Sequence, residues 1–176
     1  MAGPRLVFEM KLPRNEQKNV VRGKLTAYEG DEIALRAEAT SGKPGYQYFG
    51  NYWERSLAPL PPGEYQLETE RQVTQDPSLF DDMGRFHFHL EPYMVCKPGV
   101  NPDDIKDPET DPRCRTAFLL HLDGPFDPYA EDLDQGVGTK GCIGTRAFND
   151  FARWIANVRD RGIERIPLTV TYVQQD

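Results

Sequence analysis

The sequence of 176 residues has no long apolar run. No stretch approaches the roughly 20 consecutive apolar residues of a membrane-spanning helix, so no membrane insertion is expected. The first residues, MAGPRLVFEMKLPRNEQ, lack the uninterrupted apolar segment of a classical export signal. We therefore expect a protein that is made in the cytoplasm without a signal peptide.

Positive charge is also scarce. The chain has 21 Lys and Arg against 28 Asp and Glu, a formal net charge of -7, and it has no basic run with interleaved aromatic residues. A surface that follows nucleic-acid phosphates is therefore not expected. The length is sufficient to bury a core without metals or disulfides, which predicts a single domain over residues 1–176.

Cysteine is rare, and the three residues present, Cys96, Cys114 and Cys142, form an odd set. At least one thiol therefore stays unpaired. Cys96 and Cys114 flank a loop rich in Pro and Asp, and they either form a disulfide after delivery to an oxidising compartment or remain two buried thiols. A reducing compartment with one reactive thiol fits the odd count best.

Alternation of apolar and polar residues dominates the sequence and predicts a mainly β fold, a sandwich or barrel. In the segment 86–91, Phe86, Phe88 and Leu90 share one face of a predicted strand, while His87 and His89 share the other. Further strands are predicted around residues 33–39, 65–69, 116–122 and 167–173. Fifteen Gly and fifteen Pro supply the turns between them.

One principal helix interrupts this pattern. Apolar residues recur at helical spacing after residue 147, Thr145 is placed to cap the N-terminus, and Gly162 is placed to end the helix. The residues that define the apolar face are Phe148, Phe151, Ile155 and Val158.

The strongest chemical pattern is the segment GTKGCIG at residues 138–144, which follows a polar loop after His121. Glycines around Cys142 allow a tight turn, so that the backbone N–H groups of Lys140, Gly141 and Cys142 converge on a developing oxyanion. The following helix N-terminus and Lys140 are expected to favour a thiolate. Cys142 is therefore the candidate nucleophile and His121 the candidate base.

These residues resemble the catalytic domain of L,D-transpeptidases, whose signature is a histidine, a loop and then Ser/Thr-x-Gly-Cys. Here the signature is His121 followed by Thr139-Lys140-Gly141-Cys142. The segments TSGKPGYQYFG (40–50) and APLPPGEYQLE (58–68) are similar to the Ser-Gly strand and the Pro-rich turn upstream in such domains. The resemblance extends over about residues 25–173, and members without signal peptides are the toxins delivered by type VI secretion systems.

The resemblance implies an L,D-transpeptidase-like β-sandwich or barrel that acts on peptidoglycan stem peptides without a cofactor or metal. Cys142 attacks the carbonyl after the third residue of a tetrapeptide stem, and the terminal D-alanine leaves. His121 acts as base and is oriented by the backbone carbonyl of Leu122. A secreted antibacterial effector would act in the periplasm of a target cell, and it would have a secretion adaptor and a cognate immunity protein.

Substrate contacts are assigned with alternatives. The chain has Gly144 where many members have an arginine or asparagine, so Arg146 either binds a substrate carboxylate or is a solvated helix residue. Tyr48 belongs to an aromatic cluster that forms a groove wall or part of the core. His89 or His87 lines the substrate groove.

The sequence is also compatible with other functions. His87 and His89, with His121 or Cys114, have a spacing compatible with zinc, although a polar strand face is preferred. The chain is alternatively another Cys-His peptidoglycan amidase or endopeptidase, or a non-catalytic binding module of the same fold.

Overall fold

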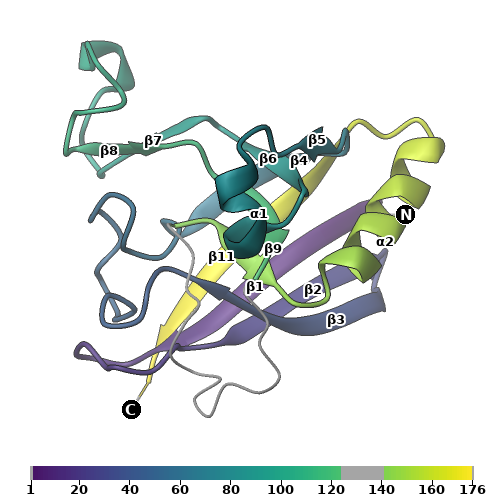
Figure 1. The fold of residues 1–176 in the computed structure, drawn as a ribbon, viewed down its shortest axis with the longest axis horizontal. Coiled ribbons are helices and arrows are strands. Elements are labelled where there is room, and N and C mark those ends of the chain that lie inside the picture. Colours follow the sequence, from purple (N-terminus) through teal and green to yellow (C-terminus); the bar gives the residue numbers. More distant parts are fainter. Residues whose placement is uncertain (1, 124–140, 176) are drawn as a thin grey trace.

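The computed structural model describes residues 2–123 and 141–175, and Figure 1 shows their arrangement. Within these residues the fold is mainly β with one principal helix, as the alternation predicts. The strands are β1 (Pro4–Leu12), β2 (Gly23–Glu29), β3 (Glu32–Ser41), β4 (Gly63–Glu68), β5 (Gln72–Val73), β6 (Phe86–Glu91), β7 (Met94–Cys96), β8 (Cys114–Thr116), β9 (Leu119–Leu122), β10 (Ile143–Thr145) and β11 (Arg165–Gln174).

The large sheet closes on itself. Its strand order is β4-β11-β1-β2-β3-β10-β9-β6-β5, and β4 pairs in addition with β6. This second pairing joins the two ends of the order into a barrel-like sheet, with the short β5 outside the ring. The first and last strands, β1 and β11, run parallel beside each other in the middle of the sheet.

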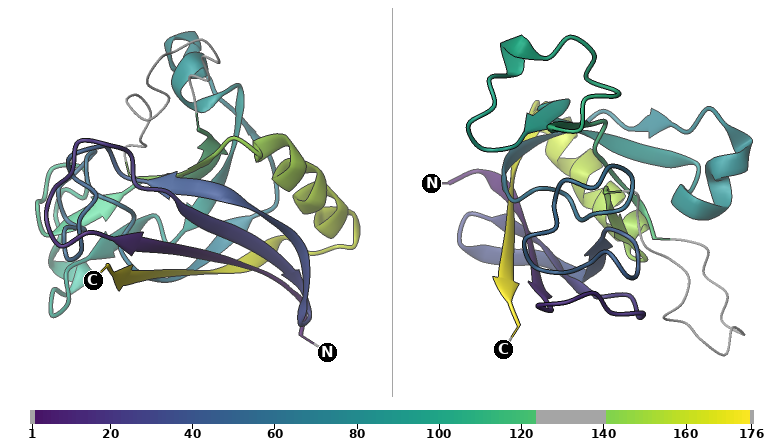
Figure 2. Two further views of the ribbon diagram at one scale, coloured as in Figure 1. Left: turned by 90° about the horizontal axis from the view of Figure 1, so that it is seen from below. Right: turned by 90° about the vertical axis from the view of Figure 1, so that its left-hand side faces the viewer.

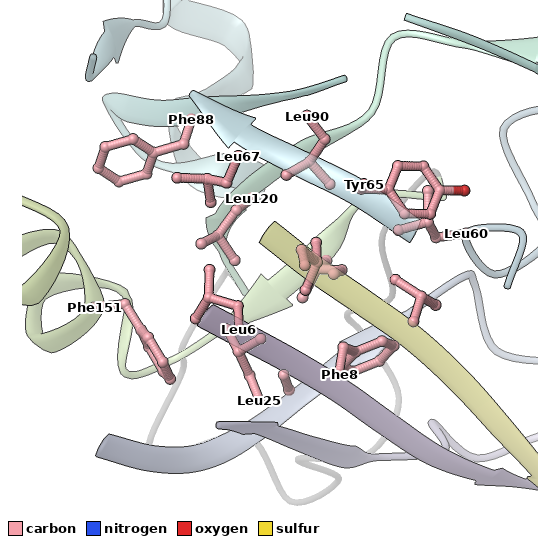
Figure 3. Close-up of a cluster of buried hydrophobic side chains, with 14 of the residues drawn as sticks. Leu6, Phe8, Leu25, Leu60, Tyr65, Leu67, Phe88, Leu90, Leu120 and Phe151 are labelled. Atoms are coloured by element: carbon pink, nitrogen blue, oxygen red, sulfur yellow. The ribbon is translucent and has the colours of Figure 1, made fainter. Parts of the chain in front are cut away.

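The barrel interior holds the hydrophobic core, which Figure 3 shows in close-up. β1 contributes Leu6 and Phe8, and the facing side contributes Phe88 and Leu120. Phe88 and Leu90 are buried on the predicted face of β6, whereas Ile33 on β3 is 50% exposed because it lies beside the turn to β2. The predicted alternation thus holds for β6 and fails at the start of β3.

Helix α2 (Phe148–Asp160) packs its apolar face into this core. The four residues predicted for that face are all buried. The predicted cap is wrong, since the N-cap residue is Ala147, while the Thr145 hydroxyl accepts a hydrogen bond from the Ala147 N–H and donates to the carbonyl of Glu38. Gly162 follows the helix with φ +86°. No helix in the described part of the chain is both long and apolar enough to cross a membrane.

Shorter helical pieces and a second sheet lie outside the barrel. The 3-10 turns are η1 (Pro77–Leu79) and η2 (Pro102–Asp104), and α1 (Phe80–Met83) is a single helical turn. β7 and β8 pair as a separate two-stranded ribbon. This ribbon lies at the opposite end of the molecule from α2 in Figures 1 and 2.

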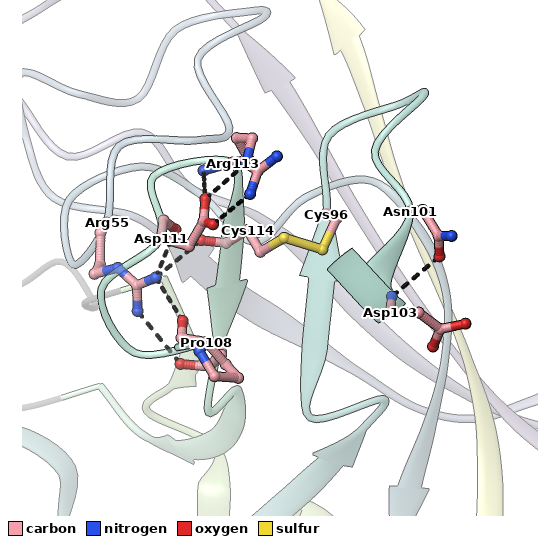
Figure 4. Close-up of a disulfide and its surroundings, with 9 residues drawn as sticks. Arg55, Cys96, Asn101, Asp103, Pro108, Asp111, Arg113 and Cys114 are labelled. Carbon is pink, nitrogen blue, oxygen red and sulfur yellow. Dashed lines mark hydrogen bonds and ion pairs between the residues drawn. A yellow bond between two sulfur atoms is a disulfide. The ribbon is translucent and has the colours of Figure 1, made fainter. Parts of the chain in front are cut away.

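A disulfide between Cys96 and Cys114 joins β7 to β8, which decides between the two alternatives for these cysteines (Figure 4). Arg55 also holds the loop between Cys96 and Cys114. The guanidinium of Arg55 donates to the carbonyls of Pro108, Asp111 and Cys114 at 2.8 to 3.0 Å. Cys142 is the cysteine that takes no part in a disulfide.

Removing the disulfide is expected to lower the free energy of unfolding by about 3 kcal/mol, because a bridge across 18 positions restricts the unfolded chain. The measurement is denaturant unfolding of Cys96→Ser/Cys114→Ser beside the oxidised parent protein. Adding a reductant to the parent should reproduce the value of the double variant. Equal stabilities of the oxidised parent and the double variant would contradict the expectation.

Candidate active site

Neighbouring strands carry the two candidate catalytic residues. β9 contains His121, and it pairs in parallel with β10, so that Gly144 lies opposite His121. Cys142 directly precedes β10, two residues before that partner. The backbone N–H of Leu119 hydrogen-bonds to the Cys142 sulfur. The pairing therefore brings near each other two residues that are distant along the chain.

The His121 ring is buried and fixed by its own neighbour. Its Nδ1 lies 2.6 Å from the carbonyl oxygen of Leu122, which is the contact that the family resemblance implies. Because a carbonyl only accepts hydrogen bonds, Nδ1 carries the proton of the neutral ring. Nε2 is then the nitrogen available to accept a proton, as a general base requires.

Burial determines the state of the Cys142 thiol. It raises the pKa of this thiol to about 11, while the Leu119 N–H and the charge of Arg115 act in the opposite direction. The expectation that the surroundings favour a thiolate is therefore wrong for the resting protein. α2 begins only at Phe148, with β10 in between, so the helix N-terminus does not follow Cys142 directly. At neutral pH the sulfur keeps its proton until a base removes it.

Arg115, a residue that no sequence pattern indicated, follows Cys114 on β8 and is 2% exposed. Its guanidinium donates to the carbonyl oxygens of Tyr52, Pro59 and Ala58 at 2.7, 2.5 and 3.1 Å. Arginine is rarely this buried, so its residue type did not predict a buried side chain on β8.

The guanidinium lies directly against the cysteine motif. A Cβ atom on Gly141 would lie 1.8 Å from Arg115 Nη2, and Gly141 has φ +97°. Glycine is therefore required at this position both for its backbone conformation and for the close approach of the arginine. Thr139 and Lys140, the other predicted members of the motif, lie outside the described residues.

The three histidines of the chain lie close together around this site. His87 on β6 is the cross-strand partner of His121, and its ring stacks on that of His89 with 5.2 Å between centroids. His87 Nδ1 is 3.1 Å from the hydroxyl of Thr74. Burial lowers the pKa of His87, and the neighbouring His89 and His121 lower it further.

No group of metal-ligating side chains is found at these histidines within the described residues. Among residues 2–123 and 141–175, no three His, Cys, Asp or Glu side chains are grouped so that they could hold a metal ion. Cys114, one of the ligands considered, is bonded to Cys96. On β6, His89 is exposed and His87 is half-buried.

The candidate substrate residues lie at different places on the surface. His89 is exposed on β6 opposite Leu119, whose N–H contacts the Cys142 sulfur. Arg146 is exposed in the turn between β10 and α2. Tyr48 lies in the loop between β3 and β4 and is partly buried, and its hydroxyl donates to Glu54 at 3.4 Å.

A buried ion pair anchors the chain just after His121, another feature that the sequence did not indicate. Asp123 is 1% exposed, its carboxylate lies 2.7 Å from Arg22, and its N–H donates to the carbonyl of Thr145. These contacts fix the end of β9 to β10 and to the start of β2. They therefore support the relative placement of His121 and the cysteine segment.

Comparisons with known proteins do not identify the chain. No protein-family model matches it, and no match is found among curated proteins.

Proposed function

We propose that this protein is a cysteine-dependent L,D-transpeptidase or L,D-carboxypeptidase acting on peptidoglycan tetrapeptide stems. The observation that carries the proposal is the placement of His121 and Cys142 on paired segments, with His121 Nδ1 held by the Leu122 carbonyl. This arrangement leaves Nε2 as the base for the thiol of Cys142, the cysteine outside the disulfide.

In the proposed reaction, Nε2 of His121 takes the proton of the Cys142 thiol, and the sulfur attacks the carbonyl carbon after the third stem residue. The backbone N–H groups around Gly141 and Cys142 stabilise the oxyanion. Collapse of this intermediate breaks the amide bond, and the imidazolium protonates the departing amine of D-alanine. The stem is left as a thioester on Cys142.

A second molecule then resolves the thioester. An amine of another stem gives a crosslink, water gives a shortened stem, and a free D-amino acid gives an exchanged stem. In each case His121 accepts a proton from the attacking group and returns it to the sulfur. The nature of the acceptor therefore decides whether the enzyme acts as a transferase or a hydrolase.

The disulfide supports a site of action outside a reducing cytoplasm, because such bonds persist in oxidising compartments. This agrees with the further proposal of a secreted antibacterial effector that works in the periplasm of a target cell. Such a toxin requires a secretion adaptor for export and an immunity protein that protects the producer.

The test is mass analysis of purified tetrapeptide muropeptides incubated with the oxidised protein. Loss of D-alanine, new crosslinks or exchange of the terminal residue is the expected result, and the product identifies the acceptor. Release of whole peptides or cleavage within the stem would instead indicate an amidase or endopeptidase. Unchanged masses at high enzyme concentration would contradict an activity on these stems.

One observation favours a second candidate, a binding module of the same fold without catalysis. The Cys142 thiol is buried, and its pKa is raised to about 11, as in a structural cysteine. This candidate predicts saturable binding of stem peptides, with masses unchanged and with equal affinity after Cys142→Ala. Isothermal titration with a purified tetrapeptide stem measures that affinity.

A further inference from the structure

Arg115 is a buried cation, and its hydrogen-bond partners among the described residues are neutral. Its three hydrogen bonds go to backbone carbonyls, and its guanidinium carbon lies 5.5 Å from the centre of the Phe118 ring. No ion pair with a carboxylate is formed by Arg115 within the described residues. A buried charge without a counter-anion is costly, so a group nearby that can become negative would be strongly stabilised by it.

The ionisable groups around the guanidinium identify that anion. The groups that act on it are Tyr172 on β11, Tyr65 on β4, Cys142 before β10 and Arg55 in the loop between β3 and β4. Burial raises the pKa of both tyrosines, so they stay neutral, and Arg55 has the same sign of charge. Burial raises the pKa of Cys142 as well, but Cys142 directly precedes β10, which pairs with the strand of the candidate base His121, so a base is at hand to remove its proton.

We propose that Arg115 is a positioning residue whose fixed positive charge stabilises the Cys142 thiolate when its proton passes to His121; this deepens the proposed function and depends on it. In that step the S–H bond breaks, an N–H bond forms at Nε2 of His121, and the electron pair stays on sulfur. A neutral pair becomes thiolate and imidazolium.

The charge is already in place before the reaction. The carbonyls of Tyr52, Ala58 and Pro59 hold the guanidinium in one orientation. Because Gly141 has no side chain, the guanidinium approaches the backbone of the cysteine segment closely. No reorganisation is needed when the sulfur becomes charged, which is the condition under which a fixed charge is most effective. Burial raises the pKa of the Cys142 thiol and the charge of Arg115 lowers it. In this proposal, the arginine thereby reduces the free-energy cost of proton transfer from Cys142 to His121.

The test is the pH dependence of alkylation of Cys142 by iodoacetamide, without reductant. The disulfide withholds Cys96 and Cys114, so each protein reports one thiol. We compare the parent protein with Arg115→Met, which keeps the length and apolar body of the side chain but loses its charge. The matched control is Arg55→Met, because Arg55 also donates to three backbone carbonyls but holds the loop between β7 and β8.

Arg115→Met is expected to slow alkylation near neutral pH at least about tenfold, the effect of a rise of about one unit in the thiol pKa. Arg55→Met should stay within about twofold of the parent, because the hydrogen bonds of Arg55 within the described residues go to the loop between β7 and β8 and to Thr116, not to Gly141 or Cys142. A folded Arg115→Met protein with the parental pH profile would overturn the proposal.

Loss of the three carbonyl contacts could unfold Arg115→Met, so Arg115→Lys is measured beside it. Lysine restores the charge without the fork, and its alkylation rate should stay within about threefold of the parent. A folded lysine variant at least tenfold slower than the parent would show that geometry, not charge, is what Arg115 provides. Alkylation needs no muropeptide. Its result therefore tests the role of Arg115 even if the protein proves inactive on stem peptides.

Discussion

Cys142→Ala is expected to abolish turnover of tetrapeptide stems, by roughly 10⁴-fold or more, because no other group can form the thioester. The other two cysteines cannot replace it, since they are joined to each other. The measurement is release of D-alanine at saturating substrate by the parent and the variant. Parental turnover by the alanine variant would exclude covalent catalysis by this residue.

The fold of Cys142→Ala serves as the control. The side chain is buried, and losing the sulfur atom should cost about 1 kcal/mol in the free energy of unfolding. Denaturant unfolding should therefore show a folded protein with a slightly lower midpoint. Stem peptides should still bind to it, which separates the loss of chemistry from the loss of the site.

His121→Asn is the second large effect, an expected fall in kcat of about 10²–10⁴-fold. The asparagine amide can keep the hydrogen bond to the Leu122 carbonyl that Nδ1 makes at 2.6 Å, but it has no basic nitrogen in place of Nε2. Residual activity should rise with pH toward the Cys142 pKa of about 11, because hydroxide replaces the lost base. Steady-state rates across the pH range measure both effects.

His87→Asn is the matched control for this variant. His87 lies opposite His121 in the antiparallel pairing of β6 and β9, and its Nδ1 also has one oxygen partner, the Thr74 hydroxyl. We expect kcat to change less than about tenfold, since this residue is not assigned a proton-transfer step. If the two asparagine variants lost equal activity, the role of base could not belong to His121 alone.

Much of the fold follows from local sequence patterns. Strict alternation around Phe88 predicts β6, and the helical spacing of Phe148 and Phe151 predicts α2, because each pattern fits one period. β10 is three residues long, which is too short for an alternation of apolar and polar residues to be recognised. Closure of the sheet also escapes prediction, since the β1–β11 and β4–β6 pairings connect distant segments.

The candidate site likewise contains residues that the sequence predicts and one that it does not. Cys142 and His121 are indicated by their residue types and by the glycine frame, and the structure places them on paired segments. Arg115 is not predictable, because its position depends on carbonyls of Tyr52 and Pro59 that come from another part of the chain. The thiol pKa is predicted in the wrong direction because burial, which raises it, depends on tertiary packing that the sequence pattern does not show. An unrecognised strand also separates Cys142 from α2.

The parallel pairing of β1 with β11 has a consequence for the order of events during synthesis. β11 lies between β1 and β4 in the sheet, yet it is made after every other strand. Contacts between such distant segments form slowly, after the intervening chain has been ordered. A nascent chain on the ribosome therefore has Cys142 and His121 but not the closed barrel around them, and the nucleophile matures only once residues 165–174 have emerged.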